Sequence, residues 1–264
     1  MKKICITLIL PTIFIFAKVH YAKMEPFESI ELKSSTSGLV SSVAIEKEGT
    51  FVEQKRIIQI EDILETENLT EMNNSLNITE RMLAVNQKIA TNLEKVLKRK
   101  ESQYNRYNQI TTASKSQKND AFDAFVTAQT QYLQNKEKIL SLKKEILNFK
   151  HQIFQLKDTI TKKAIVVKNK YLYKLMVRKG DFVTSGTPLA MLYDTQKAKL
   201  TLFLLPEELK DINKKTIYIN DIKTTYKINK IWDIADKNHI SSYQVEIYID
   251  APKRFSKLKK VEFK

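Results

Sequence analysis

Apolar side chains recur every seven residues through the middle of the chain, in two consecutive series. The first series runs from Leu69 to Tyr104, with a companion series three residues further on. The second runs from Phe125 to Ile160, and its companion series runs from Ala121 to Leu156. A seven-residue repeat with two apolar positions keeps one side of a helix facing a partner helix. The pattern therefore predicts two long coiled-coil helices.

The two predicted helices cover residues 62–110 and 114–161, with a short polar stretch between them. The region from Thr50 to Lys179 contains neither Gly nor Pro, as expected for uninterrupted helices. Because so short a connection returns the second helix antiparallel to the first, we expect a hairpin with its tip at about 110–116. Each helix would be ~70 Å long. Two separate long helices in a bundle are the alternative interpretation.

We call the line of heptad residues along which the two helices meet the seam. The sizes of the seam residues predict a register for the hairpin. Pairing residues whose numbers sum to 225 places Leu83 opposite Leu142 and Tyr104 opposite Ala121. Near the tip, large side chains then meet small ones, as close packing prefers. Asn86 and Asn135 are polar residues on the seam, and such residues fix register at some cost in stability.

Two β-like segments flank the helical middle and resemble each other. Both contain a strand, a charged turn ending in Gly, the pattern x-Phe-Val and a second strand, at about 38–60 and 172–192. Each half is too small to bury a core alone, so we expect the two to complete one β-sandwich at the base of the hairpin. The glycines suit tight turns that need positive φ, and the chain has only four: Gly38, Gly49, Gly180 and Gly186.

The C-terminal third has the pattern of a small antiparallel β domain. Tyr243 to Ile249 alternates apolar and polar side chains, as a half-buried strand does. Pro206 followed by two acidic residues is typical of the start of a short helix. Five or so short strands with one short helix predict a small β-barrel.

This order of parts resembles the periplasmic adaptors, or membrane fusion proteins of the HlyD type, of tripartite efflux and type I secretion systems. The resemblance covers residues 35–263, and the two β halves look like the parts of a lipoyl or biotinyl carrier domain. It implies an elongated α+β fold in which an antiparallel coiled-coil α-hairpin interrupts a split lipoyl-like β-sandwich and a small antiparallel β-barrel follows. In true carriers a modified Lys occupies the turn between the halves. Because about a hundred helical residues replace that turn here, we expect no cofactor.

The resemblance and the residue patterns together divide the chain into five segments. We expect a signal peptide at 1–22, a first lipoyl-like half at 23–61, the helical hairpin at 62–162, a second lipoyl-like half at 163–195 and the β-barrel at 196–264.

The resemblance also implies partners. It predicts a subunit that links an inner-membrane transporter, of RND or ABC type, to a TolC-like outer-membrane channel. It further implies a homo-oligomeric ring, hexameric in the family. The alternatives are a lipoyl- or biotinyl-like carrier domain of a transferase and a purely structural coiled-coil envelope protein.

Specific tip residues match the family pattern for docking on TolC-like channels. Arg106 and Ile110 have the spacing of the family's Arg and Leu, and Ser114 corresponds to a following Ser, although this tip is about three residues shorter. The tip region is also basic, with seven Lys or Arg residues against one acid between residues 95 and 118. We expect an acidic docking partner for the basic residues, which include Lys98, Arg99, Lys115 and Lys118.

The N-terminus has the form of a secretory signal. Two lysines precede an apolar run from Ile4 to Ala17, which is shorter than a membrane span requires. The signal would end at Ala17 or Ala22, and an uncleaved N-terminal anchor is the alternative. Either way, we expect a periplasmic protein associated with the inner membrane.

Composition excludes several classes of function. With four glycines in 264 residues, the chain lacks the Gly-rich loop of a P-loop or Rossmann enzyme. One Cys and three scattered His exclude a Cys-based zinc site, and no catalytic constellation can be argued from spacing, so we expect no enzyme and no metal. The net charge of +15 would suit nucleic acid, but the secretory signal argues against that partner.

Overall fold

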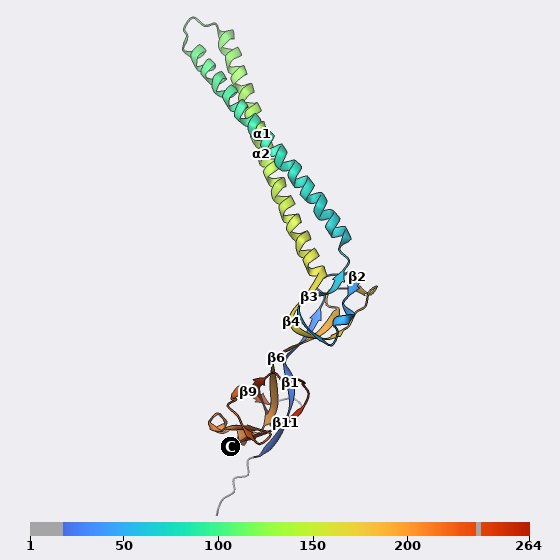
Figure 1. The fold of residues 1–264 in the computed structure, drawn as a ribbon. Helices are drawn as coiled ribbons and strands as arrows, with labels where there is room; N and C mark the ends of the chain where they lie inside the picture. Colours follow the sequence, from blue (N-terminus) through green and yellow to red (C-terminus); the bar gives the residue numbers. More distant parts are fainter. Residues whose placement is uncertain (1–17, 236–238) are drawn as a thin grey trace, which may run out of the picture.

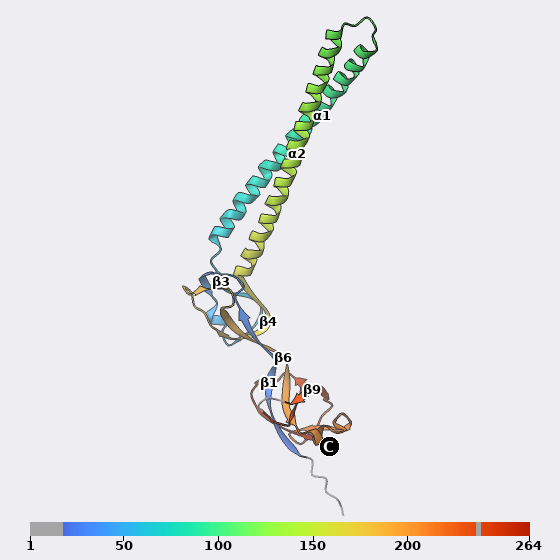
Figure 2. The same ribbon diagram turned by 180° about the vertical axis from the view of Figure 1, so that it is seen from behind.

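The computed structural model describes residues 18–235 and 239–264. The protein is elongated, with a long two-helix hairpin standing on two β regions that follow one another along the molecule (Figures 1 and 2). We call the β region next to the helices the upper β region and the other the lower β region. The tip of the hairpin is the end of the molecule farthest from the lower β region.

The hairpin consists of α1 (Ile63–Gln109) and α2 (Lys115–Lys163), of 47 and 49 residues. These bounds lie within two residues of the predicted ones, and the helices pack against each other as an antiparallel pair. Apart from Lys163, the buried residues of both helices all belong to the predicted heptad series: Thr79, Ala121, Ala128, Leu142, Ile146 and Ile153. The seam predicted from the sequence is therefore the packed face.

Polar and aromatic contacts across the seam show the register. The Asn135 Nδ2 amide donates a hydrogen bond of 3.1 Å to Asn86 Oδ1. The ring of Tyr104 stacks on Phe125 with the centroids 5.9 Å apart. The predicted register placed Asn135 opposite Ala90, one turn from Asn86 on the same stripe. The observed contacts thus agree with it to within one helical turn.

The upper β region joins the two segments that flank the hairpin. Its elements are β2 (Gly38–Val43), the 3₁₀ turn Ile45–Lys47, β3 (Thr50–Ile60), β4 (Ala164–Leu175), β5 (Phe182–Val183) and the adjoining parts of β1 (Val19–Lys33) and β6 (Pro188–Leu204). Strand β2 pairs with β5 and β3 pairs with β4, so each segment supplies partners for the other. One core contains residues from both: Val40, Val52, Ile57, Ile58, Ile60, Val167, Leu172, Leu175, Val177, Val183, Leu189, Ala190 and Leu192. The two halves complete one core, as expected.

The lower β region has a second core. Its elements are the remaining parts of β1 and β6 with α3 (Pro206–Leu209), the 3₁₀ turn Ile212–Lys214, β7 (Ile217–Ile219), β8 (Ile222–Lys223), β9 (Ile228–Ala235), β10 (Tyr243–Asp250) and β11 (Leu258–Phe263). Strand β10 lies between β6 and β9, and β11 lies between β1 and β7. Its core contains Ala22, Met24, Ala198, Leu200, Leu202, Leu204, Ile212, Ile217, Val245, Ile247, Ile249 and Val261.

Two long strands run through both β regions, and this differs from the segment boundaries expected from the sequence. Strand β1 starts in the lower β region, where it pairs with β11, and ends in the upper β region along β6. Strand β6 pairs with β4 in the upper β region and with β10 in the lower one. Residues near 23 and 196, taken as segment boundaries, are therefore interior to strands. Ala22 and Met24 are both buried, because alternate side chains of a strand point to the same face. These two side chains anchor the start of β1 in the lower core.

The predicted signal sequence lies mainly outside the described residues, which begin at Lys18. Its expected end at Ala22 does not: Val19 to Ala22 form the start of β1, and Ala22 pairs with Lys259 of β11. Within the described residues, no helix is both long enough and apolar enough to cross a membrane.

Candidate functional site

The hairpin tip is a tight turn closed by a capping box. Helix α1 ends at Gln109, and Ile110 follows in extended conformation. Ser114 caps α2: its Oγ accepts a hydrogen bond of 3.2 Å from the Gln117 backbone N–H, and Gln117 Oε1 accepts one of 2.9 Å from the Ser114 N–H. This reciprocal pair satisfies two of the free donors at the start of α2 and defines where the helix begins.

The three predicted docking residues all lie at this tip. Arg106 lies in the last turn of α1, where a cation complements the helix dipole. Ile110 is 40% exposed, although it is apolar. The Ser114 hydroxyl accepts the capping bond and keeps its proton for a further hydrogen bond. The turn thus presents a cation, an apolar side chain and a hydroxyl to solvent.

The four residues predicted to form a basic surface fall into two groups along the hairpin. Lys115 begins α2, and Lys118 Nζ lies 3.5 Å from the Asn108 carbonyl oxygen, so both belong to the tip. Lys98 and Arg99 lie about 12 Å further down α1, at 1.5 Å per residue. Lys98 forms an ion pair of 2.8 Å with Glu94 and lowers the pKa of that carboxyl group. The uncompensated charge at the tip therefore comes mainly from Arg106, Lys115 and Lys118.

An aromatic cluster beneath the tip was not anticipated from the sequence. The Tyr104 ring contacts both Phe125 and Phe122, with centroid distances of 5.9 and 5.4 Å. Tyr104 and Phe125 were identified as seam residues, whereas Phe122 lies off the seam and is largely exposed. Aromatic pairs of this kind hold the helix ends together where the turn alone would leave them free to separate.

A second apolar stripe on the outer face of α2 was also missed. It has its own seven-residue spacing, and its exposure rises from 38% at the first residue to 70% at the last: Val126, Leu133, Leu140, Leu147 and Phe154. We call this the α2 stripe. The signal was present in the sequence, because the same count of seven that finds the seam also finds this series. Large apolar side chains exposed in a continuous row indicate an interaction surface.

Helix α1 carries a matching row, the α1 stripe. It is spaced by four, three and four residues, and all its members are more than 40% exposed: Ile78, Met82, Val85 and Ile89. Heptad positions are lettered a to g, and the seam residues occupy a and d. With this lettering, the α1 stripe occupies the c and g positions and the α2 stripe occupies the b position. Because the helices are antiparallel, these positions fall on opposite flanks of the hairpin.

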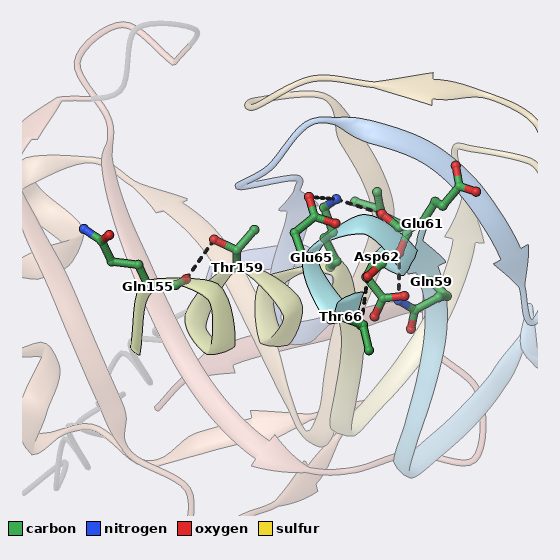
Figure 3. Close-up of polar contacts among 9 residues, drawn as sticks. Gln59, Glu61, Asp62, Glu65, Thr66, Gln155 and Thr159 are labelled. Atoms are coloured by element: carbon green, nitrogen blue, oxygen red, sulfur yellow. Dashed lines mark hydrogen bonds and ion pairs between the residues drawn. The ribbon is translucent and has the colours of Figure 1, made fainter. Parts of the chain in front are cut away.

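The base of the hairpin is fixed by a buried lysine. Lys163, the last residue of α2, donates to Glu65 Oε1 at 2.5 Å and to the Glu61 carbonyl oxygen at 2.7 Å. Figure 3 shows the Glu65 and Glu61 groups that this ammonium joins, at the start of α1. The hydrogen bond from Lys163 lowers the pKa of the Glu65 carboxyl group. No motif or spacing in the sequence distinguishes this pair from the other Lys and Glu residues.

The four glycines lie in the upper β region, where Gly38 begins β2 and the other three lie in turns. Gly49 and Gly180 have φ values of +78° and +94°, which confirms the expected positive φ in the two charged turns. Gly38 is required for a different reason, since a Cβ there would lie 2.7 Å from Ile60 Cγ2. Gly186, with φ +89°, lies in the turn between β5 and β6. In the described part of the chain, no cluster of three or more His, Cys, Asp or Glu side chains is arranged to hold a metal.

Solved structures share this architecture. MacA from Actinobacillus actinomycetemcomitans matches with a TM-score of 0.72 and 14% identity, over 94% of this chain and 78% of that protein. A MacA–MexA chimeric protein containing the Pseudomonas aeruginosa MexA α-hairpin domain matches with a TM-score of 0.58 and 14% identity, over 94% and 81% of the two chains. The membrane fusion protein Spr0693 from Streptococcus pneumoniae R6 matches with a TM-score of 0.53 and 10% identity, over 94% and 99%.

No protein-family model and no curated protein sequence matches the chain. The likeness is therefore one of structure. The chain shares the fold of MacA and of the membrane fusion protein Spr0693 over nearly its whole length, which agrees with the fold that the resemblance implied.

Proposed function

We propose that this chain is the adaptor subunit of a tripartite pump, in the periplasm and associated with the inner membrane. In that role it links an inner-membrane transporter, of RND or ABC type, to a TolC-like outer-membrane channel. The observation that carries the proposal is the placement of an exposed, basic hairpin tip at the far end of an elongated molecule with the adaptor fold. A protein that acts by bridging needs contact surfaces at its two ends rather than a catalytic pocket.

The β regions fit the same role. We interpret the upper β region as the split lipoyl-like sandwich and the lower one as the small β-barrel. The long strands β1 and β6 run through both, so they connect the regions by two hydrogen-bonded strands rather than by a flexible linker. In the proposed assembly, the lower β region faces the transporter and the hairpin tip faces the channel.

The two stripes support a ring of side-by-side copies. They lie on opposite flanks of the hairpin, so the α1 stripe of one copy can pack on the α2 stripe of the next. In the predicted register Val85 is level with Leu140, and Ile78 is level with Leu147. Copies joined in this way stand at equal height, as closed cyclic symmetry requires of a head-to-tail contact. The family resemblance adds the expectation of six copies.

The stripe pairing has a direct test by disulfide formation between copies. Val85→Cys together with Leu140→Cys, in a Cys5→Ser background, should give a ladder of covalent oligomers on mild oxidation. The two positions lie on opposite flanks of one hairpin, so a bond within a single copy is excluded by geometry. Ser141→Cys in place of Leu140→Cys is the control and should give no ladder, because this exposed position lies about 100° around the helix from Leu140. An equal ladder from both variants would remove the stripes from the interface.

The bridging role is tested by isolating the protein with its partners. Affinity purification of the tagged chain from solubilised envelopes, after mild cross-linking, should recover an inner-membrane transporter and an outer-membrane channel. The Arg106→Asp variant should no longer recover the channel but should still recover the transporter, because the proposed transporter contact is at the other end of the molecule. Recovery of the unaltered chain without either partner would count against the proposed role. Recovery of both partners in equal amounts with Arg106→Asp would count against the proposed tip contact.

A further inference from the structure

A cleft of about 820 Å³ lies where the two β regions meet. Strands β1 and β6 pass through this junction, and their pairing is irregular there: Pro26 faces Ala198, whereas Glu28 faces Asp194. The extra residues of β6 interrupt the regular ladder between the two regions. The proposed bridging role does not use this cleft.

Three tyrosines of the upper β region, Tyr171, Tyr173 and Tyr193, line one side of the cleft, and we call them the aromatic floor. Ser29 pairs with Tyr193, which pairs with Tyr171, and residues directly opposite in neighbouring strands share a face. Tyr173 follows on the same face of β4, with its ring 5.1 Å from that of Tyr193. The neighbouring side chains of Leu172 and Leu192 point into the core instead. The tyrosines therefore lie on the outer surface of the sheet, facing the cleft.

A basic loop of the lower β region, residues 252–256, also lines the cleft. Its position is fixed by backbone hydrogen bonds to β1: Ser256 N–H donates to the Met24 carbonyl oxygen at 2.8 Å, and Met24 N–H donates to the Lys257 carbonyl oxygen at 2.9 Å. Phe255 packs against the lower core. The loop therefore holds the exposed Lys253 and Arg254 at the cleft instead of leaving them on a loose segment.

The charge of the cleft is strongly positive. Its lining includes four cationic side chains, Lys23, Lys199, Lys253 and Arg254, and one carboxylate, Glu25. Lys199 is paired with the buried Glu246 at 3.3 Å, and Glu25 lies 3.9 Å from Lys23. Among the described residues, Lys253 and Arg254 form no ion pair. Two cations without an ion-pair partner and three tyrosine rings thus line the same cleft.

We propose that this cleft binds an anionic aromatic molecule of drug size, with its rings on the tyrosine floor and its carboxylate or sulfonate group on Arg254 and Lys253. Planar rings stack on aromatic side chains, and the guanidinium fork of Arg matches a two-oxygen anion. The volume lies within the range of about 300–1,000 Å³ that is typical of small-molecule sites. Because the floor and the loop belong to different β regions, the bound molecule bridges them.

The first test measures affinity for naphthalene-1-sulfonate by isothermal titration, with the full-length protein. Lys253→Glu combined with Arg254→Glu should weaken binding about tenfold or more, since two charge-assisted contacts are lost. Tyr193→Ala should also weaken it. The control, Lys168→Glu with Lys174→Glu, makes the same charge change at exposed positions of β4 outside the cleft lining and should have little effect. Equal weakening by both charge variants, or no binding by the unaltered chain, would overturn the proposal.

The second test locates the probe on the molecule, because aromatic anions also adhere to exposed apolar rows such as the α2 stripe. Ser29→Cys in a Cys5→Ser background places one thiol at the edge of the floor, and Ser141→Cys places one on the hairpin. Saturating naphthalene-1-sulfonate should slow thiol labelling about tenfold at position 29 and leave it unchanged at 141. Protection at 141 but not at 29 would place the probe on the helices and end the assignment. This readout does not require the charge variants to fold.

Discussion

The replacement Lys163→Met tests how the base of the hairpin is held. The Lys163 side chain is 8% exposed and donates to the Glu65 carboxylate and the Glu61 carbonyl oxygen. Methionine retains most of the apolar stem and removes only the ammonium group. Breaking a fully buried ion pair costs about 3–5 kcal/mol. Glu65 is 23% exposed and regains some solvation, so we expect a loss of about 2–3 kcal/mol in the free energy of unfolding.

The assay is urea denaturation followed by far-ultraviolet circular dichroism, which reports the helices. The matched control is the preceding residue. Lys162 pairs with Asp158 at 2.6 Å on the exposed side of the same turn, and Lys162→Met should cost no more than about 0.5 kcal/mol. If both variants lose the same small amount, the buried pair does not stabilise the hairpin and the reasoning is wrong.

The pH dependence provides an independent check of the same pair. The hydrogen bond from Lys163 lowers the pKa of Glu65 below its ordinary value of 4.5. A carboxyl group whose pKa is depressed by folding stabilises the folded state above its unfolded pKa, and this contribution is lost as the pH falls through the folded value. The stability of the unaltered chain should therefore decrease in acid, below about pH 4.5, by more than that of Lys163→Met. Parallel pH profiles would contradict this.

Three further outcomes follow from the structure. Leu83→Cys with Leu142→Cys should form a disulfide within one chain, whereas Leu83→Cys with Ile160→Cys should not; gel mobility before and after reduction distinguishes them, and the reverse result would disprove the register. Arg106→Asp should abolish export of the pump's substrate, whereas secretion and thermal unfolding of the protein itself should stay unchanged. Full export of the substrate would exclude this residue from the docking surface. If the signal is cleaved, mass spectrometry of the mature protein should place the new N-terminus before Ala22, because that residue is buried in the lower core; a terminus after it would mean that β1 does not start as described.

The helical hairpin was readable from the sequence because its pattern is local and long. Six heptads on each helix fixed the seam, and the absence of Gly and Pro excluded breaks. The Asn86–Asn135 hydrogen bond then agreed with the predicted register to within a turn. The β halves were found for the same reason, since each repeats a turn ending in Gly49 or Gly180 with positive φ.

The parts that the sequence did not show depend on contacts between distant segments. A strand that belongs to two cores, such as β1, has no local signal at the point where it passes from one core to the other. Lys163 is one of many lysines in the chain, and only tertiary packing separates it from its exposed neighbour Lys162. The aromatic floor likewise needs the pairing of β4 with β6. The α2 stripe is different, because its spacing was visible but a seam was already assigned to that helix.

The most direct test of the central claim uses the hairpin tip. Ser114→Cys, in a Cys5→Ser background, carries a short photo-crosslinker in living cells, and captured proteins are identified by mass spectrometry. The same label at Ser141, on the helix away from the tip, is the control. The proposed role predicts that position 114 captures an outer-membrane channel and that position 141 does not. Capture at position 114 of only this protein itself, or of an inner-membrane component, would contradict the bridging role assigned to the tip.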